Sequence, residues 1–212
     1  SNERRRPTDP ERQNDIDLTA AEIAAKGRID LATERDITLD TKEISDSNHI
    51  LFGANAYRND SSQKDIGTTL AAGKDITLNA GGKIDARAAE INTAEKLSLH
   101  AGEDINITAG KEKTFVEEWS KDTWHGIASS RTTIRHDIKN EQGAVESSLG
   151  GKEIAIEAEN ALTIEGSRVI GDKDVTLTAK NDINIEGAAE TRKELHERKV
   201  KQSGIFGSGF GF

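Results

Sequence analysis

The stretch from residue 73 to residue 110 contains one pattern written twice, at a spacing of about 21 residues. A shift by this spacing places apolar residues on apolar residues: Ile76 on Leu97, Leu78 on Leu99, and Ile84 on Ile105. It also places small residues on small residues: Ala80 on Ala101, and Gly81 on Gly102. A fixed period of this size is typical of a solenoid, in which each coil buries its apolar side chains only against its neighbours.

The hydrophobic pattern predicts three short strands in each coil. Ile76-Thr77-Leu78 and Ile105-Asn106-Ile107 alternate apolar and polar residues, which is the signature of half-buried strands. The gaps between the apolar peaks are short, and they leave no room for crossover helices. The predicted fold class is therefore all-β, a parallel β-helix of about 21 residues per coil with extra-helical β-hairpin excursions. The inward ladder is predicted to contain Ile76, Leu78, Ile84, Leu97, Leu99, Ile105, Ile107, Ile154, Val175 and Ile183.

A longer repeat contains the shorter one. Larger shifts, one of which places Ile76 on Ile154, relate three segments without a gap, which predicts a β-helix over residues 14–187. We expect a frayed end at residues 1–13. The β-helix is predicted to contain three repeat modules, at residues 14–42, 68–110 and 149–187. Excursions from the coils are predicted at residues 43–67 and 111–148, and a C-terminal excursion at residues 188–212.

Composition agrees with a thin solenoid. Hydrophobic residues make up 33% of the 212 residues and charged residues 32%, with both signs mixed. The net charge of −9 disfavours nucleic acid as a partner. The chain has no cysteine, so we expect neither disulfides nor thiolate metal sites. It has no methionine and no visible signal peptide, which favours a processed product or an internal fragment. No run is long enough to span a membrane.

The largest excursion, residues 111–148, carries both tryptophans. Two β-prone stretches flank a middle that contains Gly126, so an antiparallel hairpin is predicted. Its side chains are a candidate contact surface for a protein or a sugar. The alternative is that the aromatic residues pack as a small satellite core. The candidate residues are Phe115, Trp119, Trp124, His125 and His136.

No catalytic residue, metal site or cofactor is predicted. His125, His136 and Asp137 lack the spacing of a zinc motif. Aspartates recur just before the strands, and we interpret them as caps of the corners rather than as calcium ligands. Asn160 and Asn181 lie one period apart, which predicts a hydrogen-bonded asparagine ladder.

The C-terminal excursion has two halves. Residues 190–201 are charged, and their pattern fits a strand or a helix. Residues 204–212 alternate Gly and Phe, which predicts an edge strand that promotes association between copies. The apolar residues of that strand are Phe206, Phe210 and Phe212.

Two strings, AAGKDITLNAGGKI and IEGSRVIGDKDVTLTAKNDINIEGAAE, resemble the haemagglutinin repeats of filamentous haemagglutinin-type exoproteins. The resemblance covers residues 14–212, and it includes a Gly-Ser signature at Gly166-Ser167 in the third module. The first module has no equivalent Gly-Ser pair. It implies a right-handed β-helical shaft, export through an outer-membrane two-partner secretion pore, and a role in adhesion or contact-dependent toxin delivery. It also implies a secreted or cell-surface location in a Gram-negative bacterium, with retention in the periplasm before deployment.

Two other functions remain open at this point. A glycan-binding adhesin would use the tryptophan-bearing hairpin against a target-cell surface glycan or protein. A β-helical polysaccharide lyase would need carboxylates gathered on one face, whereas the acidic residues here are spread over every corner. We therefore expect a structural and interaction module that is not an enzyme.

Overall fold

The computed structural model describes residues 14–204, and everything stated below concerns these residues. They form 21 strands and no helix, so the all-β class is confirmed. None of them forms a helix long and apolar enough to cross a membrane. The chain divides into two compact units. The coil unit contains residues 14–44, 64–111 and 144–189, and the sheet unit contains residues 45–63, 112–143 and 190–204.

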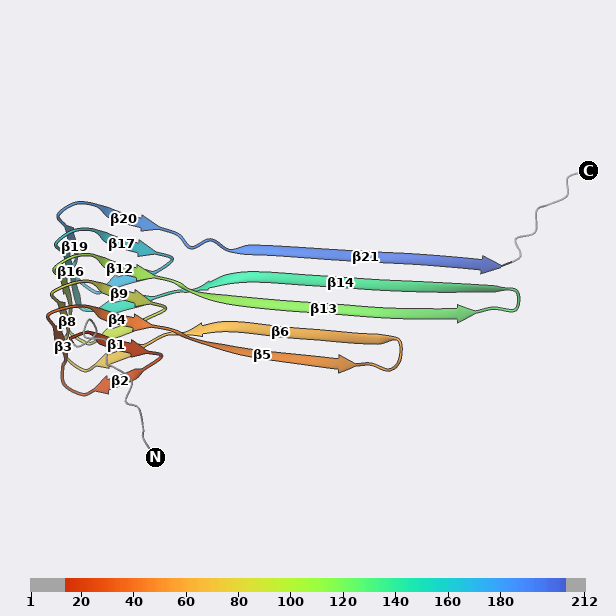
Figure 1. Ribbon diagram of the computed structural model, residues 1–212, viewed down its shortest axis with the longest axis horizontal. Coiled ribbons are helices and arrows are strands. Elements are labelled where there is room, and N and C mark those ends of the chain that lie inside the picture. The colour runs from red at the N-terminus through yellow and green to blue at the C-terminus, as the bar shows by residue number, and fades with distance from the viewer. Residues whose placement is uncertain (1–13, 205–212) are drawn as a thin grey trace, which may run out of the picture. The chain divides into compact units, whose positions relative to one another are not determined.

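The coil unit consists of three parallel sheets (Figure 1). The first sheet contains β1 (Ile16–Thr19), β4 (Ile37–Asp40), β9 (Ile84–Arg87), β12 (Ile105–Thr108), β17 (Leu162–Glu165) and β20 (Ile183–Glu186). The second contains β2 (Glu22–Ala25), β7 (Thr69–Ala72), β10 (Glu90–Thr93), β15 (Ser148–Gly151) and β18 (Arg168–Gly171). The third contains β3 (Ile29–Thr33), β8 (Ile76–Ala80), β11 (Lys96–Ala101), β16 (Glu153–Ala158) and β19 (Val175–Ala179).

Successive strands of the coil unit belong to the three sheets in rotation, which is consistent with a parallel β-helix. Ile84 pairs with Ile105, and Leu97 pairs with Ile76, so the partners in each pair are one sequence period apart. Equivalent positions of neighbouring coils therefore lie directly against each other.

The core is a ladder of aliphatic side chains between the sheets. In β8 the residues Ile76, Leu78 and Ala80 are buried, and those between them face outward. Eight of the ten predicted ladder residues are at most 2% exposed: Ile76, Leu78, Ile84, Leu97, Leu99, Ile105, Ile107 and Ile154. Val175 and Ile183 are 43% and 44% exposed, because β19 and β20 are end strands of their sheets.

The corners between sheets are crowded. A Cβ atom on Gly102 would lie 2.1 Å from the backbone oxygen of Gly81, a separation that real structures do not show. Polar side chains at the corners bond from one coil to the next. Asp36 Oδ1 accepts a hydrogen bond from the Lys83 backbone nitrogen at 2.7 Å. The predicted asparagine ladder is present, since Asn181 Nδ2 donates to Asn160 Oδ1 at 2.5 Å.

Each hairpin is inserted within a coil, between a strand of the first sheet and the following strand of the second sheet. The sequence pattern places each excursion after a complete module, but β4 and β7 belong to one turn, and so do β12 and β15. Coils without a hairpin join the same two sheets by a two-residue corner, whose first residue is in the left-handed region. These first residues are Ala20 (φ 46°), Ala88 (φ 45°) and Gly166 (φ 55°).

A buried hydroxyl closes the corner where a hairpin returns. Thr68 and Ser147 are 0% exposed, and each lies just before a strand of the second sheet. Ser147 Oγ donates to the Thr108 backbone oxygen at 2.7 Å and accepts from the Ala89 backbone nitrogen at 2.9 Å. At Thr68 the equivalent acceptor, the Asp40 backbone oxygen, lies 3.4 Å from Oγ1, and the shorter contact is to the Leu18 backbone oxygen of the preceding coil at 3.0 Å. These bonds satisfy backbone groups that the excursion would otherwise leave unpaired.

The sheet unit is a single five-stranded sheet, with strand order β21-β14-β13-β6-β5. Its strands are β5 (Lys42–Leu51), β6 (Ala56–Ile66), β13 (Gly110–His125), β14 (Ser129–Val145) and β21 (Thr191–Gly204). The charged half of the C-terminal excursion is thus a strand, and β21 pairs antiparallel with β14 over its whole length. Phe206, Phe210 and Phe212 lie outside the described residues, as do residues 1–13.

Leu97→Asp is expected to unfold or strongly destabilise the coil unit. The change removes about 1.5–3 kcal/mol of apolar burial and leaves a carboxylate without a partner in the ladder. The control is Ser98→Asp, which faces outward on the same strand between Thr77 and Ala155. Thermal unfolding followed by circular dichroism checks this. Equal melting temperatures for the two variants would show that the inward and outward assignment is wrong.

Deleting residues 110–146 together with Ala109→Gly is expected to leave the coil unit folded. The deletion joins residue 109 to Ser147, which reproduces the Gly166-Ser167 corner of a coil that has no hairpin. Hydrogen exchange of the β-ladder amides measures the outcome. Loss of protection in β12 and β15 would mean that the hairpin is part of the core of the coil unit.

Candidate contact surface

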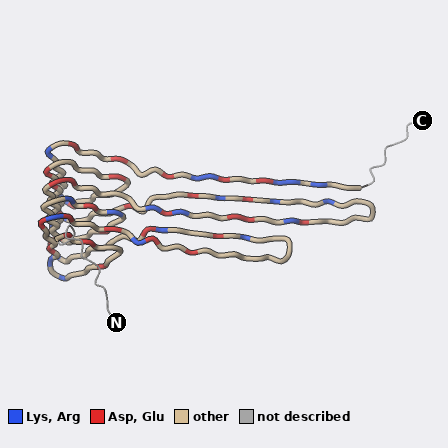
Figure 2. Tube along the Cα trace, viewed as in Figure 1, with Lys and Arg blue, Asp and Glu red and all other residues tan. Residues whose placement is uncertain are grey.

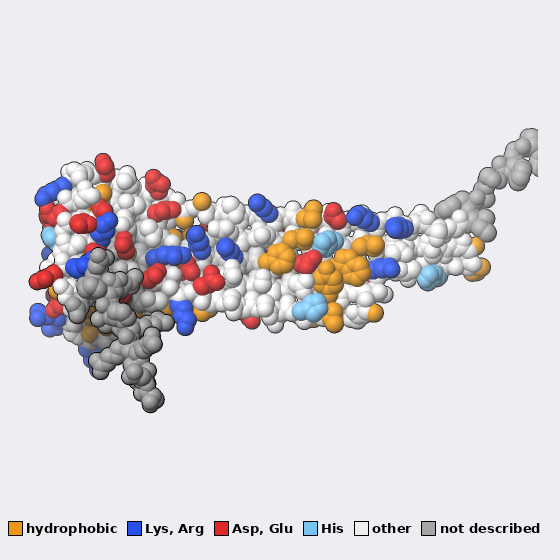
Figure 3. Space-filling model, in the orientation of Figure 1, with side chains coloured by type: hydrophobic (Ala, Val, Ile, Leu, Met, Phe, Trp, Pro, Cys, Tyr) orange, Lys and Arg blue, Asp and Glu red, His pale blue; other side chains and the backbone are white. Residues whose placement is uncertain are grey.

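The sheet unit has two chemically different faces, because side chains alternate along each strand. We call one the aromatic face; it carries Tyr57, Asn59, Glu117, Trp119 and His136, which contact one another. In the space-filling view, hydrophobic side chains gather over the strands of the sheet unit, with histidines and an acidic group among them (Figure 3).

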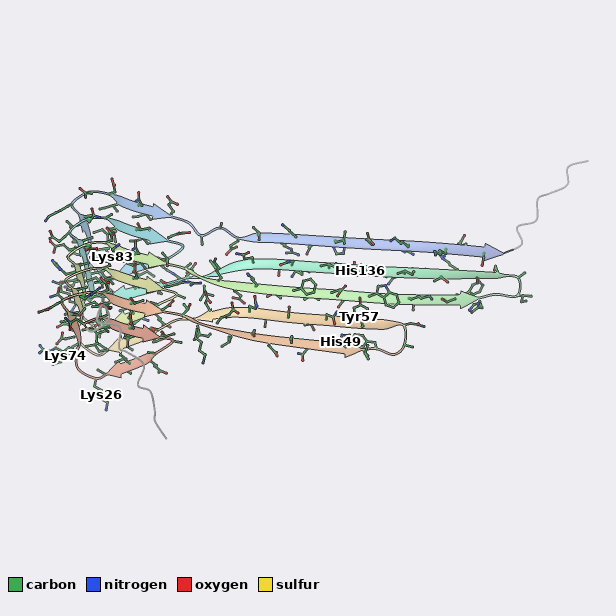
Figure 4. All side chains as sticks on the ribbon, in the orientation of Figure 1. Lys26, His49, Tyr57, Lys74, Lys83 and His136 are labelled. Atoms are coloured by element: carbon green, nitrogen blue, oxygen red, sulfur yellow. The ribbon has the colours of Figure 1, made fainter. Side chains whose placement is uncertain are left out.

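An aromatic cluster occupies the middle of this face. The rings of Tyr57 and Trp119 stack with centroids 5.8 Å apart and planes 16° from parallel. The His49 ring lies 5.9 Å from that of Tyr57. Figure 4 shows His49, Tyr57 and His136 on β5, β6 and β14. The cluster therefore joins strands that are far apart in the sequence.

Glu117 is the polar centre of the cluster. Its Oε2 accepts a hydrogen bond from Asn59 Nδ2 at 2.9 Å. Its Oε1 accepts one from His136 Nε2 at 2.9 Å and a longer one from the Tyr57 hydroxyl at 3.3 Å. Three donors thus converge on one half-buried carboxylate, which supplies the acceptors that these donors need.

These contacts shift two pKa values. The hydrogen bond from Asn59, followed by that from His136, lowers the pKa of Glu117 against the opposing effect of burial. Burial raises the pKa of Tyr57, and the neighbouring Glu117 carboxylate raises it further. The cluster therefore holds Glu117 ionised and Tyr57 protonated at neutral pH.

The predicted contact residues do not form one surface. Trp119 and His136 lie in the cluster. Phe115 is on the same side of β13 as Glu117 and Trp119, because the three residues are two positions apart. Trp124 is on the other face and is 64% exposed, so the three aromatic residues do not pack as one satellite core. His125 is exposed at the end of β13.

The opposite face, which we call the ion-pair face, carries alternating charges. Arg58 bonds Asp60 at 2.8 Å and Glu118 at 2.9 Å, and Lys139 bonds Glu141 at 2.8 Å. Figure 2 shows basic and acidic residues alternating along these strands. The described sheet unit has eleven acidic and eleven basic residues, whereas the coil unit has ten more acidic than basic residues.

One group in the coil unit could hold a metal ion. The ligand atoms of His100, Glu157 and Glu159 lie within 4.8 Å of one another. His100 and Glu157 are direct partners on β11 and β16. However, Lys180 Nζ already bonds the Glu159 carboxylate, and this contact lowers the pKa of Glu159. The ammonium group therefore supplies a positive charge that a metal would otherwise bring.

The recurrent aspartates serve the corners. Asp104 Oδ1 accepts hydrogen bonds from Asn160 Nδ2 at 2.6 Å and from the Ala161 backbone nitrogen at 3.2 Å. Lys96 donates its backbone N–H to Asp75 in the same way. Each of these carboxylates accepts hydrogen bonds from the corner of the neighbouring coil, which agrees with their interpretation as caps.

Sequence reasoning missed the partners of Trp119. Tyr57, Asn59 and Glu117 were not candidate residues, although Glu117 lies two residues from both Phe115 and Trp119. That spacing places all three on one side of a strand, which is a usable signal. The pairing of β6 with β13 has no such signal, because nothing in the sequence repeats between them.

The geometry defines a class: a repeat protein of stacked coils that carries polar and aromatic side chains on a separate sheet. Residues 53–139 and 126–212 match the hemagglutinin repeat family. These ranges cover more than half of the chain, so the chain belongs to that family.

Three relatives illustrate the similarity. The chain is 32% identical over 152 residues to the 16S rRNA endonuclease CdiA of Enterobacter cloacae subsp. cloacae. It is 35% identical over 151 residues to the deoxyribonuclease CdiA of Dickeya dadantii. It is 26% identical over 191 residues to a hemolysin of Proteus mirabilis.

The matches cover 71%, 69% and 74% of this chain but only 4%, 4% and 12% of the relatives. The chain thus spans a small part of the proteins that it resembles. No solved structure matches.

Glu117→Gln is expected to destabilise the sheet unit at pH 7, and the loss is expected to shrink in acid. A carboxyl group whose pKa is lowered by folding contributes stability above its unfolded pKa of about 4.3. That contribution disappears as the pH falls through the lower folded value. The measurement is the unfolding midpoint by tryptophan fluorescence from pH 7 to pH 3.

Glu118→Gln is the matched control, since Glu118 lies on the other face and is half exposed. It should change stability little at any pH. A constant difference between Glu117→Gln and the unmodified chain over the whole pH range would contradict the role given to Glu117.

Proposed function

We propose that this chain is a shaft segment of a large exoprotein of the two-partner secretion class, serving adhesion or contact-dependent toxin delivery. The observation that carries the proposal is the recurrence of one unit: a coil with a hairpin, then a coil without one. Such a repeat extends a protein without adding new chemistry. Membership of the hemagglutinin repeat family and the similarity to CdiA proteins support this role.

The proposed role is not catalytic. The nuclease names of the CdiA relatives describe proteins of which this chain matches 4%. The carboxylates of the coil unit are spread along the corners, where they accept hydrogen bonds from the next coil. This arrangement supports a structural role over that of a polysaccharide lyase, which needs its acids and bases gathered around one substrate.

The finer features of the shaft belong to the same proposal. We infer a right-handed β-helix whose plain coils contain about 21 residues each. The pairing of Ile84 with Ile105 supports this coil size. Export would use an outer-membrane partner pore, and the exoprotein would reside at the surface of a Gram-negative cell after a periplasmic stage. A target-cell protein or glycan would be its later partner.

A chimera tests the function. The matching segment of the Dickeya dadantii deoxyribonuclease CdiA is replaced by this chain, and the chimera is expressed in that organism. We expect surface display together with cell attachment or growth inhibition of target cells close to that of the unmodified protein.

The same chimera with Leu97→Asp is the control, and it should lose display because the coil core is broken. A chimera that is displayed in full but supports neither attachment nor inhibition would overturn the proposal.

A further inference from the structure

In the described sheet unit, the ion pairs of the ion-pair face give way to unpaired arginines near the start of β14, at the turn of the hairpin. From β14 to β21, directly opposed residues are at first complementary: Glu141 with Arg192, Lys139 with Glu194, and Asp137 with His196. The next pair on this face breaks the pattern, because Arg135 lies opposite Arg198. Like charges placed directly opposite each other destabilise a sheet.

A third arginine adds to this pair. Arg131, Thr133 and Arg135 alternate along β14 and therefore share the ion-pair face. Within residues 14–204, the guanidinium groups of Arg131, Arg135 and Arg198 form no ion pair or side-chain hydrogen bond. The other arginines of this face, Arg58 and Arg192, are each bonded to two acidic side chains. The three unpaired cations are therefore a local exception.

An exposed tryptophan adjoins the arginines. Trp124, Arg131 and Arg198 line one shallow recess of about 670 Å³, together with Gln202 and the hydroxyl-bearing residues Ser129 and Thr133. The indole is 64% exposed, so its surface is available to a ligand. Ser130 and Ser203 bond each other at 2.8 Å on the aromatic face, which links β14 and β21 behind this end of the recess.

The combination indicates the chemistry of the ligand. Guanidinium groups bind carboxylates through paired hydrogen bonds. An indole packs against the C–H face of a sugar ring, and amide and hydroxyl groups match sugar hydroxyls. Asp122 also lines the recess, and the sheet unit as a whole is neutral. Both facts favour a ligand with an isolated negative charge over a dense polyanion such as nucleic acid.

We propose that the recess lined by Trp124, Arg131 and Arg198, with Arg135 beside it, binds a carboxylated sugar. The arginines hold the carboxylate, and Trp124 packs against a sugar ring. This proposal is independent of the shaft role, because the shaft role rests on the coil unit and the sugar site lies in the sheet unit. It gives the sheet unit a recognition function on its ion-pair face, opposite the cluster around Glu117.

The test uses the full chain and two acidic probes, 3′-sialyllactose and trigalacturonate, with lactose as the neutral counterpart. Binding is followed by ligand-observed NMR and by fluorescence in a Trp119→Phe background, where Trp124 is the remaining tryptophan. We expect at least one acidic probe to bind about tenfold or more tightly than lactose.

Three variants locate the site. Trp124→Ala and Arg198→Gln are each expected to weaken binding about tenfold. Lys201→Gln removes the same charge from β21 but on the aromatic face, opposite Thr132, and should leave binding unchanged. Circular dichroism of each variant confirms that the fold is retained.

Several results would overturn the proposal. If neither acidic probe binds, or if Lys201→Gln weakens binding as much as Arg198→Gln, no specific site exists. If inorganic phosphate binds as tightly as sialyllactose, or if Trp124→Ala has no effect, the recess is a site for anions and not for sugars. Tighter binding of oligothymidylate, lost in the same variants, would assign it to single-stranded nucleic acid.

Discussion

The parallel register between coils is the constraint on which the coil unit depends. Each residue must meet its own equivalents in the coils on either side, so every position has to tolerate self-contact. Aliphatic residues do this inside, as Ile84 does with Ile105. Outside, an amide can meet a carboxylate of the next coil so that a donor faces an acceptor, as in Asn106 Nδ2 with Asp85 Oδ1 at 2.7 Å. At the corners, close approach of the backbones favours glycine, as at Gly81 and Gly102.

The sheet unit follows a different logic, because in the part of the chain that the structure describes it is a single layer. Without a second layer to bury its side chains, it depends on contacts between neighbouring strands. The stack of Tyr57 on Trp119 and the three donors around Glu117 supply them on one face. Ion pairs such as that of Arg58 with Glu118 link strands on the other face, where their exposure makes each contribution small.

These two logics explain what the sequence could predict. The offset between Ile84 and Ile105 is a self-comparison, so the ladder and the corner residues can be found without a structure. The contact of Tyr57 with Trp119 joins unrelated segments, and the register of long antiparallel strands leaves no repeat to detect. For the same reason β21 remained ambiguous, since its pairing with β14 is not encoded in its own pattern. Thr68 and Ser147 look like ordinary loop residues until the corner that they close is seen.

The corner closed by Thr68 or Ser147 also bears on how such chains diversify. The two described hairpins differ in length: β5 and β6 have 10 and 11 residues, whereas β13 and β14 have 16 and 17. Both nevertheless begin and end at the same place in a coil, behind the same kind of hydroxyl. In-frame insertions and deletions within a hairpin can therefore accumulate without a matching change in the coils. Genes for such repeats can exchange or resize hairpins as long as the coil sequence keeps its register.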